Sequence, residues 1–171
     1  RNAAAGFSVA FASGSVQTQT SRAPPLVQLT RADEPVLALH LPDGAIPNPI
    51  VSTSTITYSL VAPHTDLVYH VLPWGIKEEF VLHSALASAS MELLLDAPTV
   101  QLHEQADKSW LLQNAQSQTL WRILPPVGMD ANGVPAPLTL RVSDAGEFSR
   151  LTLAVDTTWL TAAERAFPIR L

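Results

Sequence analysis

The segment DLVYHVLPWGIKEEFVLHS, residues 66–84, decides the fold because it contains two runs with the side-chain alternation of a β-strand. The first run is Asp66 to Leu72 and the second is Ile76 to His83. Between them lies Pro73-Trp74-Gly75, a suitable three-residue hairpin loop with a glycine available for a left-handed position. The segment therefore predicts an antiparallel β-hairpin.

The length of the loop sets which charged side chains meet across this hairpin. A three-residue loop places Leu72 opposite Ile76 and, by alternation, His70 opposite Glu78. With a two-residue loop, we would instead expect His70 to meet Glu79. The three-residue loop is the one that we predict.

Glu78 interrupts an otherwise apolar face of the second strand. Alternation puts it on the same side as three apolar residues, Ile76, Phe80 and Leu82. The opposite side is expected to carry Lys77, Glu79, Tyr69 and Val81. The charged cluster Lys77-Glu78-Glu79 is therefore divided between the two faces of the predicted sheet.

A carboxylate that faces the core is costly unless it is paired or accepts hydrogen bonds, so Glu78 needs a partner. His70 is the first candidate, with Arg122 or Arg165 as further candidates. A half-buried glutamate beside a histidine would suit general acid–base chemistry, since burial raises the pKa of a carboxyl. The favoured interpretation is a structural pair that fixes the hairpin register.

Short β-type runs separated by Pro, Gly and Asx turns continue through the chain, which has 14 prolines and 7 glycines. The other predicted strands are Gly6 to Ala12, Leu26 to Thr30, Pro35 to His40, Ser54 to Val61, Met91 to Leu95, Thr99 to Glu104, Ser109 to Asn114, Thr119 to Ile123, Leu138 to Ser143 and Arg150 to Val155. Loops are expected at Gly14 to Pro25 and Leu41 to Pro49. Together they predict one all-β, sandwich-like domain of antiparallel sheets over residues 1–171.

One short helix is expected near the end of the chain. Asp156 or a following threonine can serve as its N-cap, and Thr161 and Glu164 have the spacing of a capping box. Pro168 is expected to stop it. The pattern predicts a helix of one to three turns.

Composition excludes several classes of function. The net charge of -5 and the scattered 10 Lys and Arg argue against a nucleic-acid partner. No apolar run approaches the roughly 18 residues that a membrane span needs. With no cysteine there is neither a disulfide nor a thiolate metal site.

No motif indicates a cofactor, a metal or a catalytic centre. The five histidines, among them a His64-x-Asp66 pair, lack the spacing of a zinc site. Asp130-Ala-Asn-Gly133 resembles the start of a calcium loop but lacks the later glutamate, and it is better interpreted as a tight turn. We find no nucleophile elbow, phosphate loop or zincin motif, and we expect no enzyme and no cofactor.

Aromatic residues offer one further candidate site. Trp110, Trp121 and Trp159 each lie in an apolar run and are expected to pack in the core. Trp74 lies in the hairpin loop and is expected to be exposed, where it could stack against a sugar.

Three stretches together resemble a known family: TDLVYHVLPWGIKEEFVL, LPPVGMDANG and LTLAVDTTWLTAAERAFPIRL. Their order and spacing are similar to those of a β-rich domain near the start of very large bacterial surface proteins of the Rhs/YD-repeat and DNRLRE-domain kind. In that pattern a Gly-(Val/Ile)-Lys-Glu strand precedes a Pro-x-x-x-Asp-Ala-x-Gly turn. An Asp-x-x-Trp-Leu helix then runs into a Tyr/Phe-Pro-Val strand. The resemblance covers Ser54 to Leu171 and departs from the pattern at Arg170, where an apolar residue or Thr is usual.

The resemblance implies a non-catalytic structural, stalk or adhesive module of a secreted protein, located outside the cell or at its surface. Its partners would be neighbouring domains of a larger parent chain, of which these residues are expected to be a fragment. The resemblance transfers no catalytic residue. It implies structural roles for the signature positions Lys77, Glu78, His70, Trp159 and Pro168.

Three alternatives remain open. The first is a carbohydrate-binding module that uses Trp74. The second is a hydrolase centred on Glu78, which would need a cleft at that residue. The third is a fibre-forming subunit that associates by strand exchange.

Overall fold

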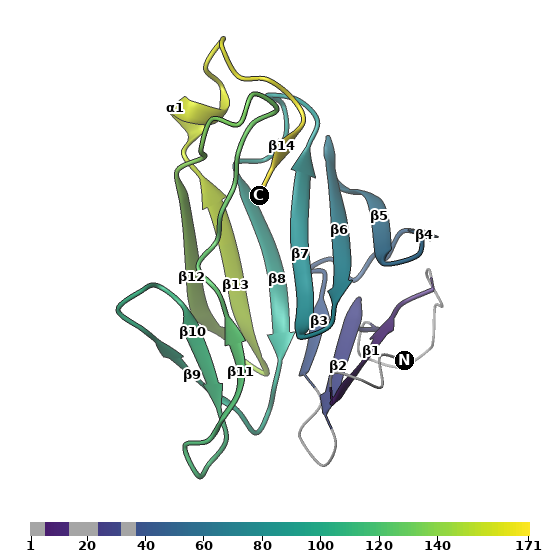
Figure 1. Ribbon diagram of the computed structural model, residues 1–171, viewed down its shortest axis with the longest axis vertical. Coiled ribbons are helices and arrows are strands. Elements are labelled where there is room, and N and C mark those ends of the chain that lie inside the picture. Colours follow the sequence, from purple (N-terminus) through teal and green to yellow (C-terminus); the bar gives the residue numbers. More distant parts are fainter. Residues whose placement is uncertain (1–5, 14–23, 32–36) are drawn as a thin grey trace.

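Three antiparallel sheets contain most of the chain in the computed structural model, which describes residues 6–13, 24–31 and 37–171 (Figure 1). The six-stranded sheet has the order β1 (Phe7–Phe11), β2 (Val27–Arg31), β3 (Leu37–His40), β8 (Ser90–Asp96), β13 (Phe148–Val155) and β12 (Leu138–Ala145). The five-stranded sheet has the order β14 (Ile169–Arg170), β7 (Gly75–Leu82), β6 (Thr65–Leu72), β5 (Thr55–Ala62) and β4 (Pro49–Val51). The third sheet consists of β11 (Thr119–Ile123), β10 (Trp110–Gln113) and β9 (Gln101–Glu104).

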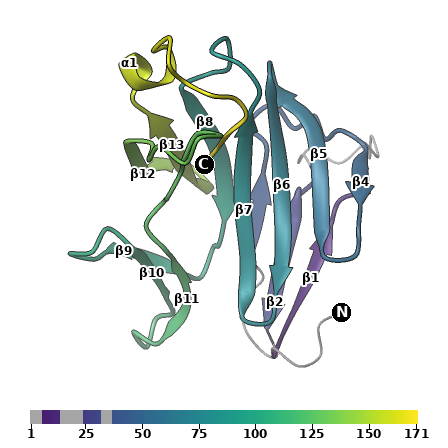
Figure 2. The same ribbon diagram turned by 45° about the horizontal axis from the view of Figure 1, so that its top comes forward.

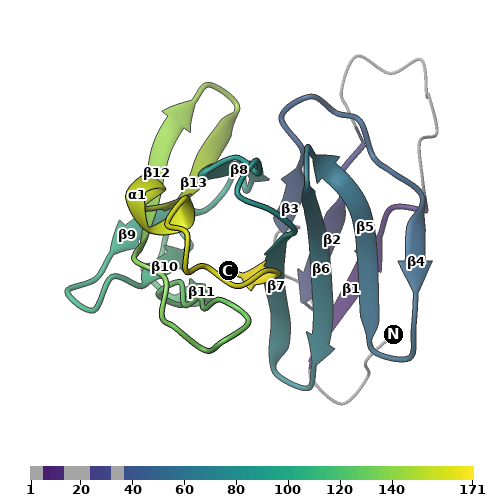
Figure 3. The same ribbon diagram turned by 90° about the horizontal axis from the view of Figure 1, so that it is seen from above.

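The layers form a sandwich with one side extension. Strands β4 to β7 lie beside β1 to β3, and the small sheet β9 to β11 lies beside β12 and β13 (Figures 1 and 3). One cluster of buried apolar side chains joins all three sheets, and it includes Tyr58, Tyr69, Leu95 and Leu112. The predicted all-β, sandwich-like fold is confirmed.

All the predicted strands form, as far as the described residues reach, with ends shifted by one or two positions in most cases. The predicted loop Gly14 to Pro25 lies largely outside the described residues. Two strands were not predicted from periodicity, β4 and β14. Both are too short to show an alternating pattern, and each adjoins or contains a proline.

The helix α1 (Thr157–Leu160) is a single turn. Asp156 caps it, since its carboxylate accepts a hydrogen bond of 2.8 Å from the backbone N–H of Trp159. The expected capping box does not form, because Thr161 ends the helix. Pro168 is not the helix stop that we predicted, and it instead precedes β14 directly.

Strand β14 is held on both sides although it has only two residues. Arg170 pairs with Val81 of β7, and Leu171 continues the ladder through two hydrogen bonds to Phe80, of 2.9 and 3.0 Å. On the other side, Arg170 and Met129 exchange two backbone hydrogen bonds of 2.9 Å. Figures 1 and 2 show this segment reaching β7 from the helix at the top of the molecule.

The double pairing depends on a close approach at Gly128. A Cβ atom there would lie 2.8 Å from Leu171 Cδ2, 2.9 Å from the Arg170 carbonyl oxygen and 3.1 Å from Leu138 Cδ1. The carbonyl belongs to backbone that is fixed in a ladder and cannot move aside easily. Only a residue without a side chain fits at this position.

We predict that Gly128→Ala lowers the free energy of unfolding by about 1 to 3 kcal/mol, because the methyl group would push β14 away from Met129. The matched control is Gly75→Ala, since an added Cβ there meets nothing within 4 Å. Its effect should stay within about 0.5 kcal/mol. Urea unfolding measures both changes, and equal losses in the two variants would contradict the close approach.

Candidate functional site

The β6–β7 hairpin closes with the two-residue loop Pro73-Trp74, and Leu72 pairs with Gly75. The predicted three-residue loop, with Leu72 opposite Ile76, is therefore wrong. Gly75 extends the strand instead of supplying the left-handed turn position, and two-residue loops are the commonest hairpin connections. The register moves by one residue relative to the prediction.

This one-residue shift exchanges the partners of the two glutamates. Tyr69 lies opposite Glu78 on the core face, although we expected it on the same face as Glu79. His70 lies opposite Lys77 on the outer face. The predicted contact between His70 and Glu78 is therefore wrong. The alternative that a two-residue loop would place His70 opposite Glu79 is also wrong, because a loop of Pro73-Trp74 pairs Leu72 with Gly75 and shifts the register toward Lys77.

Glu78 has a definite partner, as expected, but that partner is a tyrosine. The Tyr69 hydroxyl donates a hydrogen bond of 2.7 Å to Glu78 Oε2. Tyr69 is fully buried and packs against the rings of Phe11 and Tyr58, with centroid distances of 5.4 and 6.4 Å. The carboxyl thus reaches into the aromatic part of the core.

Burial controls the proton affinity of this pair. It raises the pKa of Glu78 to about 7, although the hydrogen bond from Tyr69 opposes the increase. Burial, reinforced by the nearby Glu78 carboxylate, also holds the pKa of Tyr69 well above its ordinary value. The tyrosine therefore remains a neutral donor, and Glu78 is the group that changes charge near neutral pH.

Glu79 lies on the outer face and has the opposite environment. Its carboxylate contacts Lys77 Nζ at 2.9 Å, Arg170 Nη1 at 2.9 Å and His70 Nε2 at 3.3 Å. Only 5% of Glu79 is exposed. Burial by itself would raise its pKa, but the hydrogen bonds from Lys77 and His70 and the charges of Lys77 and Arg170 together lower it. Glu79 is therefore ionised and joins three strands of the sheet.

A second ionic cluster holds the other two signature stretches together. Asp130 is buried and accepts hydrogen bonds of 2.9 Å from the backbone N–H groups of Asn132 and Val134, which confirms the predicted tight turn. Its other oxygen contacts Arg165 Nη1 at 3.3 Å. The Arg165 guanidinium lies 4.8 Å from the centre of the Trp159 ring.

These contacts rule out both arginines as partners of Glu78. Arg165 is engaged with Asp130, and Arg122 forms an ion pair with Asp107. Burial alone would raise the pKa of Asp130, but its backbone hydrogen bonds and the Arg165 charge lower it.

The roles of Tyr69 and Arg170 were not predicted from the sequence. The arginine at position 170, where the resemblance implies an apolar residue or Thr, was the available signal for the second of them.

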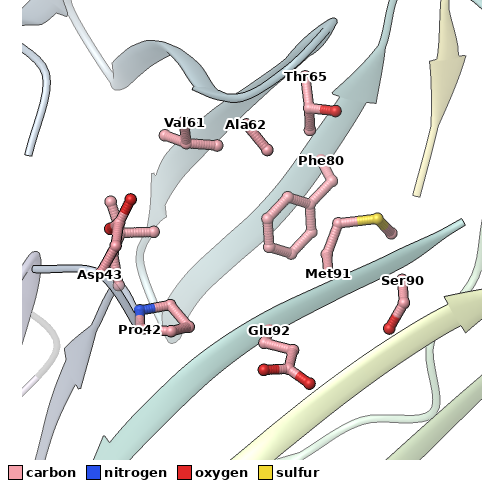
Figure 4. Close-up of a pocket in the computed structure, with 10 residues that line it drawn as sticks. Pro42, Asp43, Val61, Ala62, Thr65, Phe80, Ser90, Met91 and Glu92 are labelled. Carbon is pink, nitrogen blue, oxygen red and sulfur yellow. The ribbon is translucent and has the colours of Figure 1, made fainter. Parts of the chain in front are cut away.

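A hollow of about 310 Å³ lies between the two large sheets, but Glu78 does not line it. Its walls come from β5, β6, β7, β8 and the turn after β3, and the lining residues are Leu41, Pro42, Asp43, Val61, Ala62, Thr65, Phe80, Ser90, Met91 and Glu92 (Figure 4). General acid–base catalysis requires the acid to reach a substrate. The cleft that a hydrolase centred on Glu78 would need is not provided by this hollow.

Trp74 is 69% exposed, as the loop position predicted. Trp110, Trp121 and Trp159 are partly buried, and the Trp121 ring packs edge-on against Phe7 at a centroid distance of 6.0 Å. In the part of the chain that the structure describes, Trp74 is the one strongly exposed aromatic side chain. A platform of two stacked aromatics is therefore not present among these residues.

The histidines do not assemble a metal site within residues 6–13, 24–31 and 37–171, where no group of three suitable His, Asp or Glu side chains occurs. His83 Nε2 lies 2.9 Å from Asp66 Oδ2, and Asp66 Oδ1 accepts a hydrogen bond of 2.8 Å from the Leu60 N–H. Among the same residues, no helix has the length and apolar character needed to cross a bilayer.

Comparison of the chain with protein-family models, with curated proteins and with solved structures finds no match in any of the three.

We predict that the free energy of unfolding falls as the pH rises from 5 to 8, and that the ionisation of Glu78 causes this fall. The unfolded chain releases this proton near the ordinary value of 4.5, whereas the folded protein keeps it up to about 7. Because the folded state binds more protons between these values, its stability decreases with pH there, by about 3 kcal/mol in total. Glu79 does not interfere, since its pKa is lowered and its contribution is lost only below pH 4.5.

Urea unfolding of the parent chain and of Glu78→Gln at pH 5, 6, 7 and 8 measures this contribution. Glutamine keeps an acceptor for Tyr69 but cannot ionise, so the variant should gain about 2 to 3 kcal/mol relative to the parent between pH 5 and 8. The histidines are common to both proteins and cancel in the difference. A stability difference independent of pH would show that Glu78 is not in a dry environment.

Proposed function

We propose that the chain is a non-catalytic structural module, a stalk or adhesive unit, of a secreted bacterial surface protein. The observation that carries the proposal is that charged residues of the hairpin connect strands within the fold. Glu79 links β6, β7 and β14 through His70, Lys77 and Arg170. Engagement in these contacts supports a structural role for the four side chains.

The arrangement of the three stretches that carry the family resemblance supports the proposal. The hairpin contacts the last stretch through Glu79 and Arg170. The stretch LPPVGMDANG contacts it through the Asp130–Arg165 ion pair and also through the Met129–Arg170 bridge. Contacts of this kind among the three stretches are expected of a module whose role is structural. We infer that this unit has a load-bearing or fold-holding role at or outside the cell surface.

A role under load also fits the way that β14 is held. Force applied at Leu171 reaches a segment that is hydrogen-bonded on one side to Phe80 and, through Arg170, on the other side to Met129. Several backbone hydrogen bonds must therefore break together before this segment detaches.

Strand β12 favours strand-mediated assembly as a second candidate function, since its eight residues form an edge of the six-stranded sheet.

The test pulls single molecules through their two ends and records the unfolding force. We expect one cooperative unfolding event whose force drops in Glu79→Gln, since that change breaks the connection between β7 and β14. The control Trp74→Ala removes an exposed loop side chain and should leave the force unchanged.

The competing functions have their own outcomes in a glycan array and a panel of chromogenic glycosides. Binding to a glycan that is lost in Trp74→Ala would replace the proposal with carbohydrate recognition. Turnover that is lost in Glu78→Gln would replace it with hydrolysis. The proposal predicts neither.

A further inference from the structure

The hollow between the two large sheets has a preformed apolar floor. Thr65, Phe80 and Met91 are at most 5% exposed, and they come from β6, β7 and β8. Figure 4 shows the Phe80 ring and the Met91 side chain close together at its centre. Its volume of about 310 Å³ is at the lower end of the range for small-molecule sites. Lys77, Glu78 and Glu79 do not line the hollow, so the inference does not rest on the proposed function.

The polar side chains of the hollow are two carboxylates, Asp43 and Glu92, and two hydroxyl groups, Thr65 and Ser90. Thr65 Oγ1 donates its hydrogen to the Pro63 carbonyl, at 3.2 Å. Asp43 Oδ1 accepts a hydrogen bond of 3.1 Å from the Ala45 N–H, and Glu92 Oε2 accepts from Arg150. The second oxygens of the two carboxylates have no hydrogen-bond donor recorded among the described residues.

The charge of the lining is one-sided. Two carboxylates line the hollow, and its ten lining residues include no Lys, Arg or His. Arg150, from outside the lining, compensates Glu92. The Asp43 side chain is exposed at the edge of this apolar space, where it can pair with a cation whose apolar part lies inside the hollow.

We propose that this hollow binds a small aliphatic primary amine. The alkyl chain occupies the space beside Phe80 and Met91, and the ammonium group donates hydrogen bonds to the carboxylate of Asp43, with Glu92 as a second acceptor. An alkyl carboxylate of the same length would bring a negative charge against Asp43. A neutral alcohol would gain the apolar contact but lack the ion pair.

The experiment titrates the full chain with octylammonium chloride, sodium octanoate and 1-octanol, and follows the methyl NMR signals of Met91 and Ala62. We expect octylammonium to shift these signals and to bind at least about tenfold more tightly than octanoate, with octanol between them. Equal affinity for the ammonium and the carboxylate would overturn the proposal. The absence of any shift at these methyl groups would overturn it as well.

Substitutions locate the site. Ala62→Trp fills the hollow and should abolish binding, and Ser90→Trp does the same from the other sheet in case the first variant does not fold. Asp43→Asn should weaken octylammonium at least about threefold and leave octanol unchanged. The matched control is Asp144→Asn, since Asp144 likewise accepts a hydrogen bond from the N–H two residues on but lies outside the hollow. Equal weakening by both asparagine variants would contradict a role for Asp43.

Discussion

The nearly buried carboxylate of Glu79 is the constraint on which much of the five-stranded sheet depends. A charge at 5% exposure is tolerated only when several donors compensate it. Those donors come from three strands, with His70 on β6, Lys77 on β7 itself and Arg170 on β14. The last of them is far away in the sequence, so the ion pair can form only when the end of the chain has reached the hairpin.

The two adjacent glutamates show how strand alternation creates opposite electrostatics from identical side chains. Glu78 points to the core, where burial raises its pKa to about 7 and a neutral tyrosine is its partner. Glu79 points outward to cations that lower its pKa. In this charged interruption of an apolar run, Glu78 is thus a polar group in the core, and Glu79 connects neighbouring strands. Neither carboxylate lines the hollow between the sheets.

The fold class, the positions of twelve strands and the capped helix could be predicted from the sequence because each rests on local periodicity or turn chemistry. The two shortest strands could not, since β4 has three residues and β14 has two, too few to show an alternating pattern. Strand β14 also forms only by pairing with the distant strand β7. The register of the hairpin was wrong by one position because Pro73-Trp74-Gly75 allows two loop lengths and local sequence does not choose between them. That single position decided whether His70 or Tyr69 would meet Glu78, so the candidate site depended on the least predictable feature.

A double-mutant cycle of Glu79→Gln and Arg170→Gln, measured by urea unfolding, tests most directly whether the ionic connection between β7 and β14 stabilises the fold. The Glu79–Arg170 contact of 2.9 Å predicts that the two losses are not additive, with a coupling energy of about 1 kcal/mol or more. Losses that add to within about 0.3 kcal/mol would mean that the two residues act independently. That result would contradict the structural role assigned to this cluster.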